Sequence, residues 1–261
     1  MPQSLSRRVA ATLLASAAAA AAVVPATAQP VGGAGFDPAS SVAAIVKVPR
    51  PWYAPRFVVE GRMRDAVPQF ESLPGLNFKA YSFARADGHY GGIYLWTDLA
   101  AARAWFAPAW FERVRRERGA EGQVRLFEVP LVLDNTPGGT SARTSARGGA
   151  APVATLVEIP VPPGVGRAAL LQGFRDALPT YRKVPGLLRK YFILSDAGRF
   201  GGIYLWQDEA SARAWHDQAW QDRVAARYGQ PATLEWFDTP ILQPGRGAEQ
   251  ALPEAVLVQA R

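Results

Sequence analysis

The 261-residue chain contains no cysteine and only two histidines, His89 and His216. The absence of cysteine excludes disulfides, thiol chemistry and cysteine-bound zinc. Two histidines far apart in the sequence and scattered carboxylates do not form a set of metal ligands. The sequence also lacks the G-x-G-x-x-G and P-loop motifs that hold nucleotide phosphates. We therefore expect neither a metal ion nor another cofactor.

Lysine is scarce as well. The formal net charge is +7, and nearly all the positively charged residues are arginines. These arginines are scattered along the chain and form no dense block. Nucleic-acid binding requires a clustered basic face with interleaved aromatic residues. The charge pattern therefore argues against a nucleic-acid partner.

Long apolar runs are confined to the N-terminus. Arg7 and Arg8 precede an alanine- and leucine-rich stretch over 9–24, and Ala26-Thr27-Ala28 fits an A-x-A cleavage site. Residues 1–28 are therefore predicted to be an export signal, and the arginine pair leaves the twin-arginine route open. A membrane anchor is the weaker alternative, because a span needs ~20 strongly apolar residues. We expect a periplasmic or secreted protein that is free of the membrane after cleavage.

An internal repeat dominates the rest of the chain. Residues 91–96, Gly-Gly-Ile-Tyr-Leu-Trp, recur letter for letter at 201–206, and further matches extend in both directions at offsets of 110 or 111. A period this long indicates a duplicated domain rather than a solenoid unit. We predict an export signal at 1–28, a first domain at 42–134 and a second domain at 153–243. A linker rich in Gly, Ser, Thr and Pro joins the domains at 135–152, and a tail follows at 244–261.

Each copy has the predicted order β-α-β-β-α-β, which is the ferredoxin-like arrangement. Pro68 and Pro179 are predicted to kink or end the first helix of each copy. Asp98 and Asp208 are placed to start the second helix. The fold class is therefore α+β, with two repeats whose sheets pack face to face as an intrachain dimeric α+β barrel. The predicted elements of the two copies are strands at 44–48, 77–85, 91–96, 124–129, 155–159, 188–195, 201–206 and 233–238, and helices at 57–71, 98–118, 167–182 and 208–228.

The second copy carries the clearest family resemblance. The segment from Tyr181 to Phe192, the strand 201–206 with its alanine-rich helix, and Phe237-Asp238-Thr239-Pro240 resemble signatures of the YdhR-type monooxygenase-like family. That family belongs to the dimeric α+β barrel superfamily, together with the antibiotic-biosynthesis monooxygenases. The resemblance implies an intrachain pseudo-dimer, because single-copy relatives are dimers. It also implies cofactor-independent oxygenation of a small aromatic or quinol-type substrate.

Two other function classes stay open. One is a non-catalytic periplasmic module that binds a hydrophobic small molecule. The other is a structural or partner-binding protein whose tryptophans all lie in the core.

The second helix of each copy carries the candidate pocket. At helical spacing, four tryptophans fall on faces turned toward the sheets, where they either form plain core or wall a flat apolar slot for a planar guest. His216 replaces Phe106 on this face, and it is a candidate base or a histidine hydrogen-bonded at the pocket edge. The four tryptophans are Trp105, Trp110, Trp215 and Trp220.

Further polar candidates come from the strands and the helix end. Lys79, Lys190, Tyr94 and Tyr204 are matched between the copies and are placed to contact a substrate oxygen, although a lysine at a strand edge can also snorkel to solvent. In the same helical pattern, Arg113 and Arg223 are predicted to face inward, where they need a carboxylate or a ligand anion.

Overall fold

The computed structural model describes residues 33, 35–136, 151–245 and 257–259. The predicted export signal, most of the predicted linker and most of the tail lie outside the described residues. The first half of the chain contains β1 (Ser41–Val48), α1 (Arg56–Glu71), β2 (Leu76–Ala84), β3 (Tyr90–Trp96), α2 (Leu99–Trp105), α3 (Pro108–Arg118) and β4 (Gln123–Asp134). The second half contains β5 (Val153–Pro160), α4 (Arg167–Arg182), β6 (Leu187–Leu194), β7 (Arg199–Trp206), α5 (Glu209–Trp215), α6 (Gln218–Tyr228) and β8 (Thr233–Pro244).

The strands pair in a closed ring. Within the halves the orders are β4-β1-β3-β2 and β8-β5-β7-β6, all antiparallel, which is the ferredoxin-like order. Each half then joins the other, because β2 pairs with β8 and β6 pairs with β4. The mixed α+β class is confirmed. The two sheets, which we expected to pack face to face in a barrel, are also joined edge to edge, so that eight antiparallel strands form one continuous barrel.

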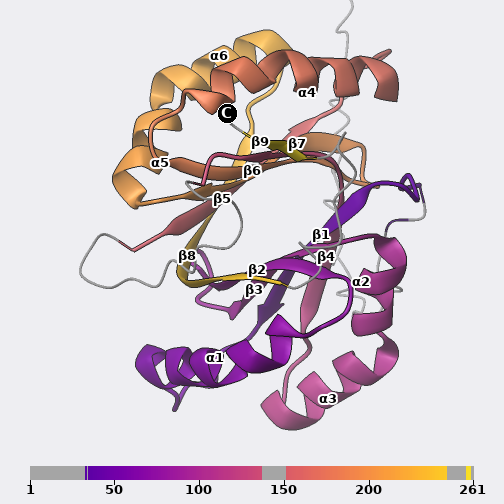
Figure 1. Cartoon of the computed structure of the whole chain (residues 1–261). Coiled ribbons are helices and arrows are strands. Elements are labelled where there is room, and N and C mark those ends of the chain that lie inside the picture. The colour runs from indigo at the N-terminus through magenta and orange to yellow at the C-terminus, as the bar shows by residue number, and fades with distance from the viewer. Residues whose placement is uncertain (1–32, 34, 137–150, 246–256, 260–261) are drawn as a thin grey trace, which may run out of the picture.

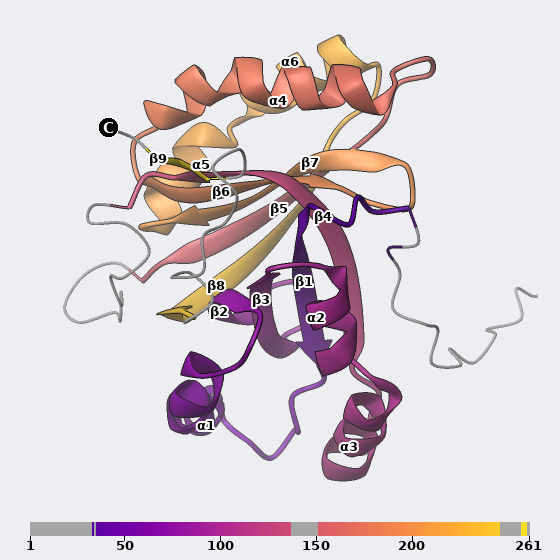
Figure 2. The same cartoon turned by 45° about the vertical axis from the view of Figure 1, so that its right-hand side comes forward.

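The length of two strands explains this difference. Strands β4 and β8 have 12 residues each, well beyond the six-residue segments predicted from the sequence. Their first parts pair inside their own half, and their last parts pair with the other half. Figure 2 shows both strands running from one half into the other. A ninth strand, β9 (Leu257–Gln259), lies parallel to the end of β4, in the tail where a further edge strand is predicted over 255–258.

Three apolar clusters hold the layers together. One fills the barrel interior and includes Ile45, Ile93, Phe127, Leu156 and Phe237. The other two lie between the outer faces of the strands and the helices, α1–α3 at one end and α4–α6 at the other (Figure 1). The helices therefore cover the outside of the barrel.

The barrel interior also contains a buried ion pair. The Arg189 guanidinium donates to the Asp134 carboxylate over 2.6 Å and lies 4.4 Å from the ring centre of Phe78. Phe78 is the first-half counterpart of Arg189 in the repeat. The first half therefore lacks the arginine that a matching ion pair would need at this position.

The first helix of each half passes through its proline. Pro68 lies inside α1 and Pro179 inside α4, so of the two predicted outcomes, a kink or an end, the helix end is wrong. Both prolines are exposed, and so are the residues four positions earlier. The carbonyls that lose their helical donors can therefore be hydrated, which lowers the penalty of an internal proline.

The second predicted helix of each half is broken in two. Phe106 ends α2 and His216 ends α5, and a new helix starts two residues later in each half. Pro108 starts α3 where its missing N–H is harmless, and the Asp217 side chain accepts a hydrogen bond from the Trp220 amide to cap α6. The single helical face expected over 98–118 and 208–228 is therefore wrong, although Asp98 and Asp208 cap as predicted.

Candidate functional site

The repeated Gly-Gly pair creates space for two different neighbours. A Cβ on Gly201 would lie 2.0 Å from the Val157 carbonyl oxygen, so the first glycine allows β7 to approach β5 closely. A Cβ on Gly202 would lie 2.9 Å from the Tyr204 ring and 3.1 Å from the Lys190 side chain. The second glycine is therefore the floor over which the Lys190 and Tyr204 side chains lie.

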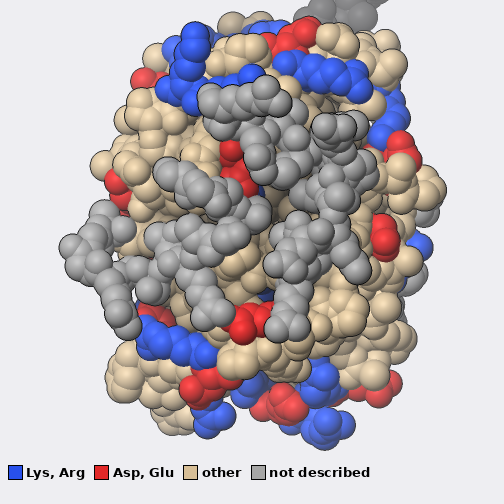
Figure 3. Space-filling view, in the orientation of Figure 1, with Lys and Arg blue, Asp and Glu red and all other residues tan. Residues whose placement is uncertain are grey.

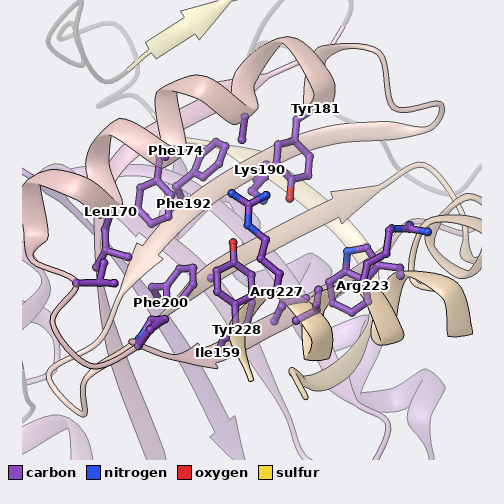
Figure 4. Close-up of a pocket in the computed structure, with 18 of the residues that line it drawn as sticks. Ile159, Leu170, Phe174, Tyr181, Lys190, Phe192, Phe200, Arg223, Arg227 and Tyr228 are labelled. Atoms are coloured by element: carbon purple, nitrogen blue, oxygen red, sulfur yellow. The ribbon is translucent and has the colours of Figure 1, made fainter. Parts of the chain in front are cut away.

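A cavity of about 540 Å³ opens above this floor, between α4 and α6. This volume falls within the range of small-molecule sites. Helix α4 supplies Leu170, Gly173, Phe174 and Tyr181, the strands supply Lys190 and Tyr204, and α6 supplies Trp220. Figure 4 shows the aromatic rings and the Tyr181 hydroxyl turned toward the cavity. The cavity suits a ligand with a flat apolar body.

Lys190, Tyr204 and Tyr181 form a hydrogen-bonded chain in the cavity wall. The Lys190 amine lies 2.6 Å from the Tyr204 hydroxyl, which lies 3.3 Å from the Tyr181 hydroxyl. The same amine lies 3.4 Å from the ring centre of Tyr181 and 4.4 Å from that of Phe192. Among the residues that the structure describes, no carboxylate lines the cavity.

Burial shifts the pKa values of the lysine and the tyrosine in this hydrogen-bonded group. It lowers the pKa of Lys190 well below its usual range and raises the pKa of Tyr204 well above its own. Contact with an aromatic face stabilises a desolvated cation by about 2 kcal/mol or more, and three rings surround the Lys190 amine. An ammonium removed from water without a carboxylate loses several kcal/mol or more. Burial therefore favours the neutral amine of Lys190 and the neutral phenol of Tyr204.

His216 lies behind the cavity wall rather than in it. Its imidazole lies 5.1 Å from the Tyr204 ring and 4.6 Å from the Trp220 ring, centre to centre. Burial, assisted by the charge of Lys190 when that residue is protonated, lowers the pKa of His216 to about 3. Thr155 Oγ1 lies 3.0 Å from His216 Nε2 and accepts from the Trp206 indole over 3.0 Å. The threonine proton finds an acceptor when Nε2 is unprotonated, so these contacts favour the Nδ1–H tautomer.

The predicted tryptophans divide between wall and support. Trp220 lines the cavity, whereas Trp215 packs behind Tyr181 with ring centres 5.5 Å apart. In the first half, Trp110 packs on Phe106 and Trp105 on Phe70. The helix break accounts for this division, because α5 and α6 present different faces to the sheet.

The sequence matches no protein-family model and no curated protein. Several solved structures match most of the chain, including the following two. One is a proposed monooxygenase from Fusobacterium nucleatum, with a TM-score of 0.57, 11% identity, and coverage of 79% of this chain and 95% of that one. The other is an anthrone oxidase-like protein, with a TM-score of 0.50, 12% identity, and coverage of 81% and 95%. This chain has a monooxygenase-like fold. The resemblance inferred from the sequence is confirmed at the level of fold.

Within this monooxygenase-like fold, the first half repeats the lysine but not the hydroxyl chain. The Lys79 amine lies 3.1 Å from the ring centre of Phe70, which occupies the position of Tyr181. Burial lowers the pKa of Lys79 and raises that of Tyr94. Lys79 makes no side-chain hydrogen bond to any described residue. Of the two lysine sites, only that of the second half joins its lysine to two phenols.

Sequence reasoning missed Tyr181, because α4 was interpreted only as a cover for the sheet. The difference between Phe70 and Tyr181 at matched positions was a signal that could have identified it. Arg113 and Arg223 are exposed, so neither is buried against the sheet as predicted, although Arg223 stands at the rim of the cavity. Val114 and Val224, one residue later, are buried in their place.

The described residues contain neither a metal site nor a helix that could span a membrane. Among the described residues, no group of three or more His, Asp and Glu side chains could hold a metal ion. No helix within those residues is both long and apolar enough to cross a membrane.

Proposed function

We propose that the second half binds a small aromatic or quinol-type substrate and promotes its oxidation by dioxygen. The observation that carries this proposal is the neutral Lys190–Tyr204 pair in the wall of an aromatic cavity. A general base is most effective when it is unprotonated at the working pH and lies within reach of the substrate. Lys190 meets both conditions, whereas His216 lies outside the lining; we therefore assign the base to Lys190.

The first step is a proton transfer. An acidic C–H between two aryl groups, or a phenolic O–H, gives its proton to the Lys190 amine. The resulting ammonium faces the rings of Tyr181, Phe192 and Tyr204 at 3.4, 4.4 and 4.2 Å. These ring faces and the new substrate anion stabilise the charge once it has formed.

The second step is the reduction of dioxygen by the substrate anion. For a diaryl methylene, the carbanion adds O₂ to give a peroxide anion, which takes the proton back from Lys190. The hydroperoxide then loses water and leaves a ketone. The carbon gives up four electrons, and the two oxygen atoms end in the ketone and in water. No cofactor is required, because the substrate supplies the electrons. The likeness to an anthrone oxidase-like protein supports this choice of substrate class.

Oxygen uptake tests the proposal. Anthrone and a naphthohydroquinone are offered to the wild-type protein, the Lys190→Met variant and the Lys79→Met variant. We expect Lys190→Met to lose turnover and Lys79→Met to retain it, because the first-half lysine has no phenol partner. Equal turnover in all three proteins would refute the role of Lys190. Ligand binding without oxygen uptake in any of them would instead favour a non-catalytic binding module.

We further propose that the chain arose by tandem duplication and folds as an intrachain counterpart of a dimer, a monomer in solution. The identical strand orders of the two halves and their repeated sequence support this proposal. We also propose that residues 1–28 are removed on export to the periplasm and that the mature protein does not attach to the membrane. Cleavage within the linker tests the assembly. Separation of the fragments into two stable monomers would contradict it, because each half lends a strand end to the other.

A further inference from the structure

Two arginines stand at the rim of the second-half cavity. Arg223 and Arg227 lie four residues apart on α6, so they share one face of the helix, and both line the cavity. Neither forms an ion pair with a carboxylate among the described residues. These two guanidinium groups put positive charge in a lining to which no described carboxylate contributes.

Arg227 is directed into the cavity. Figure 4 shows its side chain extending from α6 toward the space below Tyr181 and Lys190, while Arg223 lies to one side. Burial raises the pKa of Tyr181, and the positive charge of Arg227 acts in the opposite direction. The Arg227 guanidinium is therefore close enough to interact electrostatically with the Tyr181 phenol, the last member of the hydrogen-bonded chain that starts at Lys190. Figure 3 shows several patches of Lys and Arg side chains, with some Asp and Glu beside them, at the end of the molecule that α4 and α6 cover.

The first half does not reproduce this charge. Glu117 occupies the position of Arg227, and Arg118 occupies the position of Tyr228. Since the two halves have the same element order, the positive rim is not a requirement of the fold. Gly173 on α4 also lines the cavity, where a Cβ would meet nothing within 4 Å, and Arg62 is its first-half counterpart.

We propose that the second-half cavity binds a planar aromatic acid, with its anionic group on Arg227, its ring between α4 and α6, and Arg223 adding positive charge at the rim. This inference rests on the proposed function and names the substrate class more closely. Guanidinium binds carboxylate with paired hydrogen bonds, so it fixes orientation as well as position. With the acid held at the rim, the far edge of the ring system faces Lys190.

The test compares a matched pair of ligands, 2-naphthoate and its neutral methyl ester. Calorimetric titrations use the full chain, the Arg227→Gln variant and the Arg223→Gln/Arg227→Gln double variant. Arg113→Gln is the control, because Arg113 is the exposed first-half counterpart of Arg223. A charge-assisted contact strengthens binding by about tenfold or more. We expect the acid to bind at least that much more tightly than the ester, and we expect Arg227→Gln to remove most of this preference.

Three results would overturn the inference. These are equal affinity for acid and ester, an acid preference that survives in the double variant, and no binding of either ligand. Oxygen uptake separates this inference from the function on which it rests. Lys190-dependent turnover of a neutral hydroquinone, without acid preference, would keep the proposed function and refute the acid site. Acid-selective binding without oxygen uptake would support the acid site and reject the oxidation.

Discussion

Replacing Lys190 by methionine should stabilise the protein at neutral pH. The unfolded chain holds a charged lysine below its usual pKa of about 10.5, whereas burial keeps the folded chain's lysine neutral. The unfolded state therefore binds more protons than the folded state, and stability falls as pH falls from about 10.5 to the lowered pKa. The slope is about 1.4 kcal/mol per pH unit for each such lysine. Methionine has a similar length, and it carries no charge to desolvate.

Lys79 provides a matched control for this prediction. Because burial lowers its pKa as well, two lysines contribute to the wild-type slope, about 2.7 kcal/mol per pH unit together. Each single variant should halve that slope, and the Lys79→Met/Lys190→Met variant should remove it. Urea titrations between about pH 7.5 and 9 measure the slope in a window above the titration of His216. Oxygen uptake on the same samples separates the functional lysine from the structural one.

The opposite result would refute the charge assignment. If Lys190→Met lowers the free energy of unfolding near pH 8 and leaves the slope unchanged, Lys190 is an ammonium that its three ring contacts stabilise. A charged lysine cannot accept the substrate proton, so the proposed first step would fail with it.

The remaining predictions concern packing. Gly202→Ala should destabilise the fold by about 1–3 kcal/mol and abolish turnover, because its methyl group would press on the lysine–tyrosine pair; Gly92→Ala should have a similar effect on thermal stability but retain activity. Gly173→Leu should block ligand binding in calorimetry without loss of stability, since its side chain enters open space on a helix. Arg189→Met should lower the urea-derived stability by about 3–5 kcal/mol, because it leaves Asp134 buried and unpaired; a change of both residues to apolar ones should restore most of the loss.

The repeat made the element order predictable, but it did not predict how the barrel closes. Matching segments located the strands of both halves, and the alternation of polar and apolar residues marked their faces. Closure depends on the ends of β4 and β8, which pair with the other half over residues that the periodicity left as loop. Such pairing joins residues far apart in the sequence, so no local pattern reports it. The helix breaks were different, because Pro108 and Asp217 were visible signals of new helix starts.

The site was predictable where it rests on strands and less so where it rests on helices. Lys190 and Tyr204 lie where the strand register placed them, and the second glycine of the repeat explains how both fit. The interpretation of Trp215 and His216 assumed one continuous helix, and the break moved both behind the wall. Gly173 leaves open space in the cavity wall on α4, and a missing side chain leaves no periodic signal.

The differences between the halves separate assembly from function. Both halves keep the glycine pair and a buried lysine, so these features form part of the repeated framework. A buried lysine destabilises the fold at neutral pH in either half, so its presence alone does not mark a site. What distinguishes the second half is a phenol at Tyr181, a positive charge at Arg227 and the gap at Gly173, where the first half has Phe70, Glu117 and Arg62. All three differences line the same cavity. They have in common that each adds space, hydrogen bonding or charge where a ligand would lie, which is why the functional proposal concerns the second half alone.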